Sequence, residues 1–259
     1  MTQLLGINTK KEVKIDLAFK LPSSFTEDSP DGWGYAFFNN EEWQLFKQSL
    51  DVDKVLRIGF KTLSTHEILG KTFISHIRYA THGESSYENT HPFDFDLFDY
   101  RWVFAHYGHL RLYRQIVDRN ELFKTKGDTD SEAAFCYILE EIRKLGKKDN
   151  IKELATVIEN AAAELSTQGG LNFLLSHGDT LFAYYSGYKS LYYAVIRPPF
   201  KKNIFGENNQ IKFEIITKNV EDPITLIASE EIVKFEYWKE LKAGKVYIFR
   251  NGDLAKSII

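Results

Sequence analysis

Short runs of β-branched and aromatic residues, bounded by Gly, Asn and Asp, recur along the chain and predict β-strands. Successive side chains of a strand point to opposite faces, so the pattern also indicates which residues share a face. The predicted strands cover residues 34–38, 72–79, 102–106, 171–176, 180–185, 191–196, 212–216, 223–228 and 245–250.

A helical period replaces this pattern in the middle of the chain and predicts two helices. The first lies in TDSEAAFCYILEEIRKLG, where Thr129 and Glu132 have the spacing of a capping box and Gly146 is the expected end. The second covers residues 151–165 and ends before a Gly-Gly pair. The apolar positions of the first helix are Ala134, Ile138, Ile142 and Leu145.

The order of these elements favours a layered α+β fold, because strands come first, two helices follow, and strands resume. Alternating βαβ units would give a different order. The chain contains no internal repeat, low-complexity tract or Gly/Ser linker, so we expect one domain spanning residues 1–259.

Composition narrows the function classes. The formal net charge is −3 and both signs are scattered, which argues against a nucleic-acid partner. The sequence shows no signal-peptide pattern and no apolar stretch long enough to cross a bilayer, so we expect a cytoplasmic protein without a membrane partner. The single cysteine, Cys136, excludes an intramolecular disulfide and is expected to be a small core residue.

The segment FISHIRYATHGESSYENTHPF, residues 73–93, is unusually polar for a stretch that begins as a buried strand. Period-two alternation places Ile74, His76 and Arg78 on one face, with Arg78 pointing inward near the strand's end. An arginine there can grip a carboxylate through two parallel hydrogen bonds. An ion pair within the fold is an equally good interpretation of the pattern alone.

Two further positions are candidates for ligand contacts. In RWVFAHYGHL the strand pattern is expected to break at Tyr107 and Gly108, where a glycine after a strand can direct its N–H toward a ligand oxygen. A plain turn explains the glycine as well. Asp130 follows the cap of the first helix, where a carboxylate complements the helix dipole with or without a ligand.

The histidines do not have the spacing of a metal site. His76, His82, His91, His106 and His109 include no H-E-x-x-H motif and have no paired cysteines, so no metal and no cofactor are expected. We interpret them as hydrogen-bonding residues of the core or of a pocket.

Five ordered segments resemble the class II glutamine amidotransferases, and in particular a stand-alone bacterial branch that includes γ-glutamyl hydrolases of the ergothioneine-pathway type. The later strands resemble that branch too. The resemblance implies a four-layer αββα sandwich of the N-terminal-nucleophile type, with two mainly antiparallel sheets between helical layers. The segments are MTQLLG, DGWGYAFF, SHIRYATHGESSYENTHPF, FAHYGHL and GDTDSEAAF.

The resemblance also implies roles for particular residues. The substrate would be glutamine or a γ-glutamyl compound, whose carboxylate Arg78 would hold with help from Thr81 and His82. Asp130 would hold the substrate's α-ammonium group, and the Gly108 N–H would donate to the oxyanion. Whether a protein partner or a homo-oligomer is involved is left open.

The sequence departs from the family pattern at two positions of the reacting centre. The family's nucleophilic cysteine, freed by removal of the initiator Met, is replaced by Thr2, and the asparagine before the oxyanion glycine is replaced by Tyr107. Loss of one oxyanion donor typically lowers the rate by about 10²–10³. Two hypotheses follow: an amidohydrolase with diminished or lost activity, and a non-catalytic binding or regulatory protein on the same fold.

Overall fold

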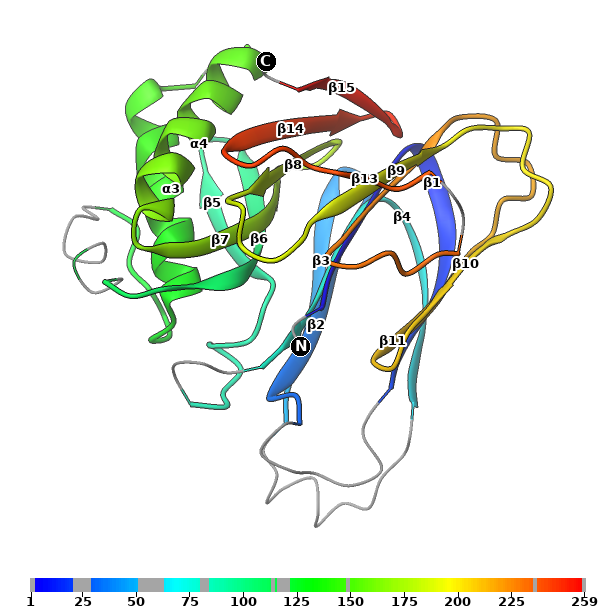
Figure 1. The fold of residues 1–259 in the computed structure, drawn as a ribbon, viewed down its shortest axis with the longest axis horizontal. Coiled ribbons are helices and arrows are strands. Elements are labelled where there is room, and N and C mark those ends of the chain that lie inside the picture. Colours follow the sequence, from blue (N-terminus) through cyan, green and yellow to red (C-terminus); the bar gives the residue numbers. More distant parts are fainter. Residues whose placement is uncertain are drawn as a thin grey trace.

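The computed structural model of the protein describes residues 3–20, 29–50, 63–79, 84–112, 115, 122–147, 150–234 and 237–257. Thr2, Thr81 and His82 therefore lie outside the described residues. The described strands form two antiparallel sheets that face each other, and helices cover the outer side of one of them (Figure 1).

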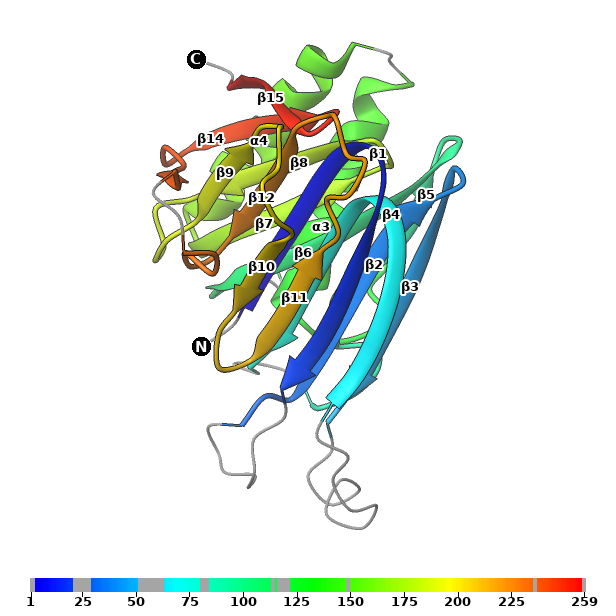
Figure 2. The same cartoon turned by 90° about the vertical axis from the view of Figure 1, so that its right-hand side faces the viewer.

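The larger sheet has nine strands, and β1 runs through its middle (Figure 2). Its main order is β13-β9-β12-β1-β4-β2-β3, while β11 pairs with β1 and β10 pairs with β11. The second half of β1 takes β11 as its neighbour after a register shift between Asn8 and Val13. The strands are β1 (Gln3–Lys20), β2 (Gly32–Asn39), β3 (Glu42–Ser49), β4 (Leu63–Arg78), β9 (Tyr192–Ile196), β10 (Ile204–Glu207), β11 (Ile211–Ile215), β12 (Ile224–Ala228) and β13 (Lys239–Glu240).

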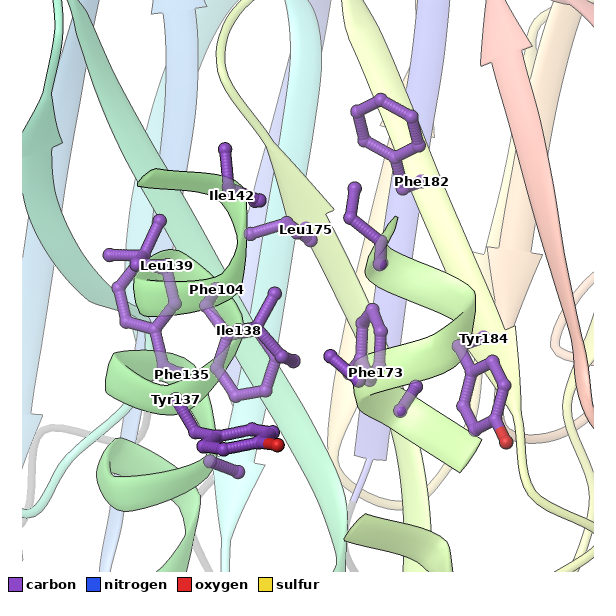
Figure 3. Packing of buried hydrophobic residues seen from close by; sticks show 14 of the residues in the cluster. Phe104, Phe135, Tyr137, Ile138, Leu139, Ile142, Phe173, Leu175, Phe182 and Tyr184 are labelled. Carbon is purple, nitrogen blue, oxygen red and sulfur yellow. The ribbon is translucent and has the colours of Figure 1, made fainter. Parts of the chain in front are cut away.

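The smaller sheet has six strands in the order β15-β14-β8-β7-β6-β5. Its strands are β5 (Phe93–Leu97), β6 (Tyr100–Leu110), β7 (Gly169–Ser176), β8 (Thr180–Tyr185), β14 (Lys245–Arg250) and β15 (Asp253–Ser257). Helices α3 (Asp130–Leu145) and α4 (Ile151–Ser166) pack on its outer face through an apolar cluster that contains Phe104, Phe135 and Phe173 (Figure 3).

A second apolar cluster lies between the two sheets. Ile74 of β4 contributes from the larger sheet, and Val103, Ala105 and Tyr107 of β6 contribute from the smaller one. Phe73 of β4 belongs instead to a third cluster on the opposite face of the larger sheet. The predicted alternation along residues 73–78 is therefore confirmed for these neighbours.

The predicted α+β sandwich with two antiparallel sheets is confirmed. Both predicted helices are also present, and α3 begins after Thr129, whose hydroxyl accepts a hydrogen bond from Glu132 N at 3.2 Å. The second half of the predicted capping box is wrong, because the Glu132 carboxylate binds the backbone N–H groups of Lys126 and Gly127 instead. No helix in the described part of the chain is long and apolar enough to span a membrane.

The predicted strands are all present, but β1, β3, β5, β10, β13 and β15 were not predicted. The first half of β1 gives no alternating signal, because residues 4–9 are buried on both faces. The turn between β2 and β3 has Asn40 and Glu41 at φ 49° and 61°, the left-handed conformation of a two-residue hairpin turn.

Asn8 makes three hydrogen bonds, one within the larger sheet and two to turns of the smaller sheet. Its amide nitrogen donates to Thr72 Oγ1 at 3.1 Å and to Asp179 O at 3.0 Å, and its oxygen accepts from Gly252 N at 2.9 Å. Asn8 and Thr72 are fully buried, so water cannot readily replace the lost partners of these groups.

We expect Asn8→Ala to lower the free energy of unfolding by about 2–4 kcal/mol, because it leaves several buried polar groups without partners. Urea unfolding followed by circular dichroism measures the change. The control variant is Lys10→Ala, on the same strand as Asn8. It removes an exposed ion pair with Asp222 and should change stability by less than about 1 kcal/mol. Equal losses in the two variants would contradict this role of Asn8.

Candidate functional site

The two sheets and the first helix bring four sequence-predicted residues to one end of the sandwich. β1 begins at Gln3, which pairs with Ile77, the residue before Arg78 at the end of β4. On the smaller sheet, Tyr107 and Gly108 lie near the end of β6, and Leu110 of that strand contacts Asp130. The beginning of β1 thus lies beside the strand that carries Arg78.

Arg78 is a buried cation, with 3% of its surface exposed. Its guanidinium donates to the carbonyl oxygen of Glu84 at 3.2 Å. Burial lowers the pKa of Arg78, and the negative charges of Asp31, Asp128 and Asp130 oppose that shift. An arginine ordinarily stays protonated in a protein, so this end of the sandwich holds a fixed positive charge among carboxylates.

Asp130 is the first residue of α3 and is also buried. Its Oδ2 accepts a hydrogen bond from Leu110 N at 2.7 Å and lies 3.7 Å from His109 Nδ1. The start of the helix favours a negative charge at this position. The carboxylate therefore both ties α3 to β6 and places an anion at the same end of the sandwich as Arg78.

A hydrogen-bond network joins the surroundings of Arg78 to the start of α3. Asn89 donates to Glu84 O at 3.0 Å, the same carbonyl that Arg78 contacts, and to Asp128 Oδ1 at 2.6 Å. Asp128 N donates back to Asn89 Oδ1 at 3.0 Å. A Cβ on Gly127 would lie 2.1 Å from that oxygen, so only glycine fits there.

Sequence reasoning did not identify Asn89 as part of this network. Its position in the ENTHPF motif marks it as polar near a buried strand, but its partners lie as far as 39 residues away along the chain. Only the folded chain shows that it connects the Arg78 segment to the helix.

Gly108 lies within a strand, so the predicted break at Tyr107 and Gly108 is wrong. β6 continues to Leu110, and Gly108 pairs with Leu171 of β7. A Cβ on Gly108 would lie 2.0 Å from Gly170 O. Glycine is therefore needed here because the two strands pack closely. The proposed donation from its N–H to an oxyanion stays a prediction.

Tyr107 points into the space between the sheets and is 8% exposed. Its ring meets the ring of Tyr188 nearly edge-on, with centroids 6.1 Å apart. The ammonium group of Lys189 lies 5.4 Å from the centroid of the Tyr107 ring. Tyr107 is thus a packed aromatic side chain, and its replacement of a family asparagine stays a prediction.

Two buried histidines lie next to Arg78 and lack hydrogen-bond partners among the described residues. The rings of His76 and His91 are 4.0 Å apart, and neither nitrogen of either ring has a partner that meets hydrogen-bond geometry. His106, in contrast, contacts Ser131 Oγ at 2.8 Å and Gly170 O at 3.2 Å. The prediction that the histidines are hydrogen-bonded is therefore confirmed for His106 and wrong for His76 and His91.

Burial explains the protonation of this pair. It lowers the pKa of His76 to about 3 and holds the pKa of His91 well below its usual value. The charges of His106 and Arg78 lower the pKa of both rings further, the backbone of His106 opposes the shift of His76, and His76 and Lys47 add to the effect on His91. Both imidazoles are consequently neutral at pH 7.

The described part of the chain contains no group of three or more His, Cys, Asp or Glu residues arranged to hold a metal ion. Cys136 is fully buried in α3, and burial raises the pKa of its thiol to about 12. It is a core residue, as predicted, and its thiol stays protonated at neutral pH.

A cavity of about 1080 Å³ lies at the opposite end of the sandwich, lined by the β2–β3, β5–β6 and β7–β8 turns. Strand register shows the separation, because Arg78 pairs with Gly32 at one end of β2 while this cavity adjoins Phe38 at the other. Asp94, one of several acidic residues in its lining, is paired with Arg101 at 2.8 Å. The cavity does not include the predicted site residues.

The chain is similar to known proteins in sequence and in fold. The family description "Glutamine amidotransferases class-II" matches residues 1–259. A Haemophilus influenzae protein is 31% identical over 266 residues, which cover 100% of this chain and 87% of that protein. YafJ of Escherichia coli is 30% identical over 262 residues, covering 98% of this chain and 99% of YafJ. Both proteins are named provisionally as glutamine amidotransferases.

Solved structures agree. The crystal structure of a "predicted glutamine amidotransferase" from Pseudomonas aeruginosa has a TM-score of 0.85 at 28% identity and covers 98% of this chain and 99% of that chain. The glutamine phosphoribosylpyrophosphate amidotransferase of Bacillus subtilis has a TM-score of 0.57 at 20% identity, and the match covers 98% of this chain and 48% of the Bacillus chain. This likeness shows a shared fold alone.

The facing antiparallel sheets define a fold of the N-terminal-nucleophile hydrolase type. Within that class, the chain belongs to the class II glutamine amidotransferases. These names do not refer to the ergothioneine branch, so that finer resemblance stays a prediction.

The His76–His91 pair predicts a pH dependence of stability. The folded protein excludes protons that unfolded histidines bind below about pH 6.5, so the free energy of unfolding falls as pH decreases from 6.5 toward the folded pKa of His76, about 3. Each imidazole contributes a slope of about 1.4 kcal/mol per pH unit within that window.

His76→Gln should reduce the slope of unfolding free energy against pH by about 1.4 kcal/mol per pH unit, the contribution of one proton. Urea titrations between about pH 4.5 and 7.5 compare the slopes of the two proteins, so a constant loss of stability from the substitution does not affect the result. Identical slopes would show that His76 takes up its proton in the folded state.

Proposed function

We propose that this chain binds the γ-glutamyl group of glutamine or of a γ-glutamyl amide, and that hydrolysis of the amide through Thr2 is diminished or lost. One observation carries the proposal: Arg78 and Asp130 are buried, opposite charges at the end of the sandwich where β1 begins. In this assignment Arg78 holds the α-carboxylate of the ligand, and Asp130 holds its α-ammonium. Thr81 and His82 assist Arg78.

The corresponding reaction requires Met1 to be removed, so that Thr2 has a free α-amine. The amine takes the proton of the Thr2 hydroxyl as the oxygen attacks the γ-carbonyl carbon, and the Gly108 N–H donates to the resulting oxyanion. The C–N bond then breaks, the leaving nitrogen receives the proton, and the γ-glutamyl group is left as an ester on Thr2. Water hydrolyses that ester to glutamate and restores the hydroxyl.

Two features support low or absent turnover. A threonine hydroxyl is much harder to deprotonate than the family's cysteine thiol, whose pKa is about 8.5. Tyr107 is held by packing against Tyr188, and its rigid ring is longer than the asparagine it replaces. The same packing favours the second candidate function, a non-catalytic γ-glutamyl-binding or regulatory protein.

We expect Arg78→Ala to weaken binding of glutamine or glutamate by about 10–100-fold, because a charged hydrogen bond typically contributes about 1.5–3 kcal/mol. Isothermal titration calorimetry measures the change. Arg101→Ala is the matched control, since Arg101 pairs with Asp94 at the far end of the sandwich and should not affect binding.

Arg78→Lys keeps the charge and controls for loss of folding, and thermal unfolding establishes that each variant is folded. Binding by the wild-type protein that Arg78→Ala leaves unchanged would refute the assignment of Arg78. No binding of glutamate, glutamine or γ-glutamyl amides to the wild-type protein would refute the proposed function itself.

Restoring the family residues tests the state of the reacting centre. The double variant Thr2→Cys, Tyr107→Asn should raise release of ammonia from glutamine by at least about 10²-fold, because it returns the thiol and one oxyanion donor. Mass spectrometry must first establish that Met1 is removed. A processed double variant that binds glutamine without turning it over would mean that other parts of the centre have changed as well.

Thr2→Ala tests whether residual turnover depends on Thr2. Any ammonia release by the processed wild-type protein should disappear in this variant, while glutamine binding persists. Turnover that survives Thr2→Ala would remove Thr2 from the mechanism.

A further inference from the structure

The loop between β8 and β9 is fixed beside Tyr107 by a buried side chain. Asn172 of β7, directly opposite Tyr107 in the sheet, is fully buried. Its amide nitrogen donates to Tyr188 O at 2.6 Å, and its oxygen accepts from Ser186 N at 3.1 Å. The loop is therefore held to the smaller sheet at two points.

Glycine makes room for this loop on the same strand. A Cβ on Gly170 would lie 2.3 Å from the ring of Tyr188, so the ring rests directly on the backbone of β7. Lys189 has a φ of 54°, a left-handed conformation that a lysine adopts only when its surroundings hold it there. The hydroxyl of Tyr185 donates to Lys189 O at 2.6 Å and fixes that backbone further.

The charge of Lys189 has phenols for neighbours instead of a carboxylate. Its Nζ lies 5.4 Å from the centroid of the Tyr107 ring and 5.5 Å from that of Tyr188. Lysine is cationic at neutral pH, and interaction with the Tyr107 hydroxyl raises the pKa of Lys189 further. Among the described residues no acidic side chain forms an ion pair with it, so its positive charge is not compensated.

Lys189 contacts β6 at Tyr107, and this position along β6 sets its distance from the groups proposed to bind the glutamyl end. Lys189 lies at Tyr107, Asp130 is bound to Leu110, and Gly108 is between them. Tyr107 and Leu110 are separated by about 10 Å, the length of three residues of extended chain. An extended γ-glutamyl dipeptide has the same reach.

We infer that Lys189, held between Tyr107 and Tyr188, binds an anionic group on the amide-nitrogen side of the ligand, so that the site selects γ-glutamyl compounds whose amine portion carries a carboxylate. This inference rests on the proposed function, because it assumes that Asp130 and Arg78 bind the glutamyl end. Lys189 is then a specificity-determining residue for the other end.

Two amides of glutamic acid test this preference. γ-Glutamylglycine and γ-glutamylethylamide share the glutamyl group and a two-carbon amine portion, but only the first carries a second carboxylate. We expect the wild-type protein to bind γ-glutamylglycine about tenfold more tightly, as one additional charged hydrogen bond predicts. Calorimetry at low ionic strength measures both affinities, and added salt should reduce the difference.

Lys189→Met removes the charge but keeps an unbranched side chain. It should abolish the preference by weakening only γ-glutamylglycine, and Lys189→Arg should retain it. Lys201→Met, at an exposed lysine of the β9–β10 connection, is the control and should behave as the wild type.

The outcomes separate the two claims. Equal affinity of the wild-type protein for both compounds, or an equal effect of Lys189→Met on both, would overturn the role of Lys189 and leave the γ-glutamyl site intact. If the wild-type protein bound neither compound, the proposed function would fail, and this inference would fail with it.

Discussion

The central position of β1 in the nine-stranded sheet is the constraint on which the rest of the structure depends. β1 has β4 on one side and β12 and β11 on the other, so it cannot leave the sheet without breaking three strand pairings. Its register sets Gln3 opposite Ile77. A chain terminus is usually free to fray. Here the first described residues instead belong to the middle of a buried sheet, next to the strand that ends at Arg78.

The buried charges at this end are positioned mainly by backbone groups and neutral side chains. Arg78 contacts the Glu84 carbonyl, Asp130 accepts from Leu110 N, and Asn89 connects the two segments. These contacts fix the direction of each charged side chain. In the proposed site Arg78 and Asp130 would form a template for a zwitterion, because each α-substituent of an amino acid would then meet a group of opposite sign.

The parts of the fold that were predicted from sequence depend on local signals. α3 was predicted from its period and from Thr129 and Gly146, and the inward face of Arg78 followed from counting residues along one strand. The first half of β1 was missed because burial on both faces removes alternation. Asn89 and the unpartnered His76–His91 pair were missed because their surroundings come from distant segments, and no local pattern reports an absent hydrogen bond.

In the proposed site, binding and turnover would depend on different residues, so the two proposed departures from the family pattern would not have equal consequences. The groups proposed to hold the glutamyl end also stabilise the fold: Asp130, the first residue of α3, joins the helix to β6, and Arg78 shares the Glu84 carbonyl with Asn89. Tyr107, which the proposal places on the side where the amide nitrogen would leave, contacts Tyr188 and Lys189. A change at that position can therefore alter the chemistry or the choice of amine portion while the glutamyl end keeps its geometry.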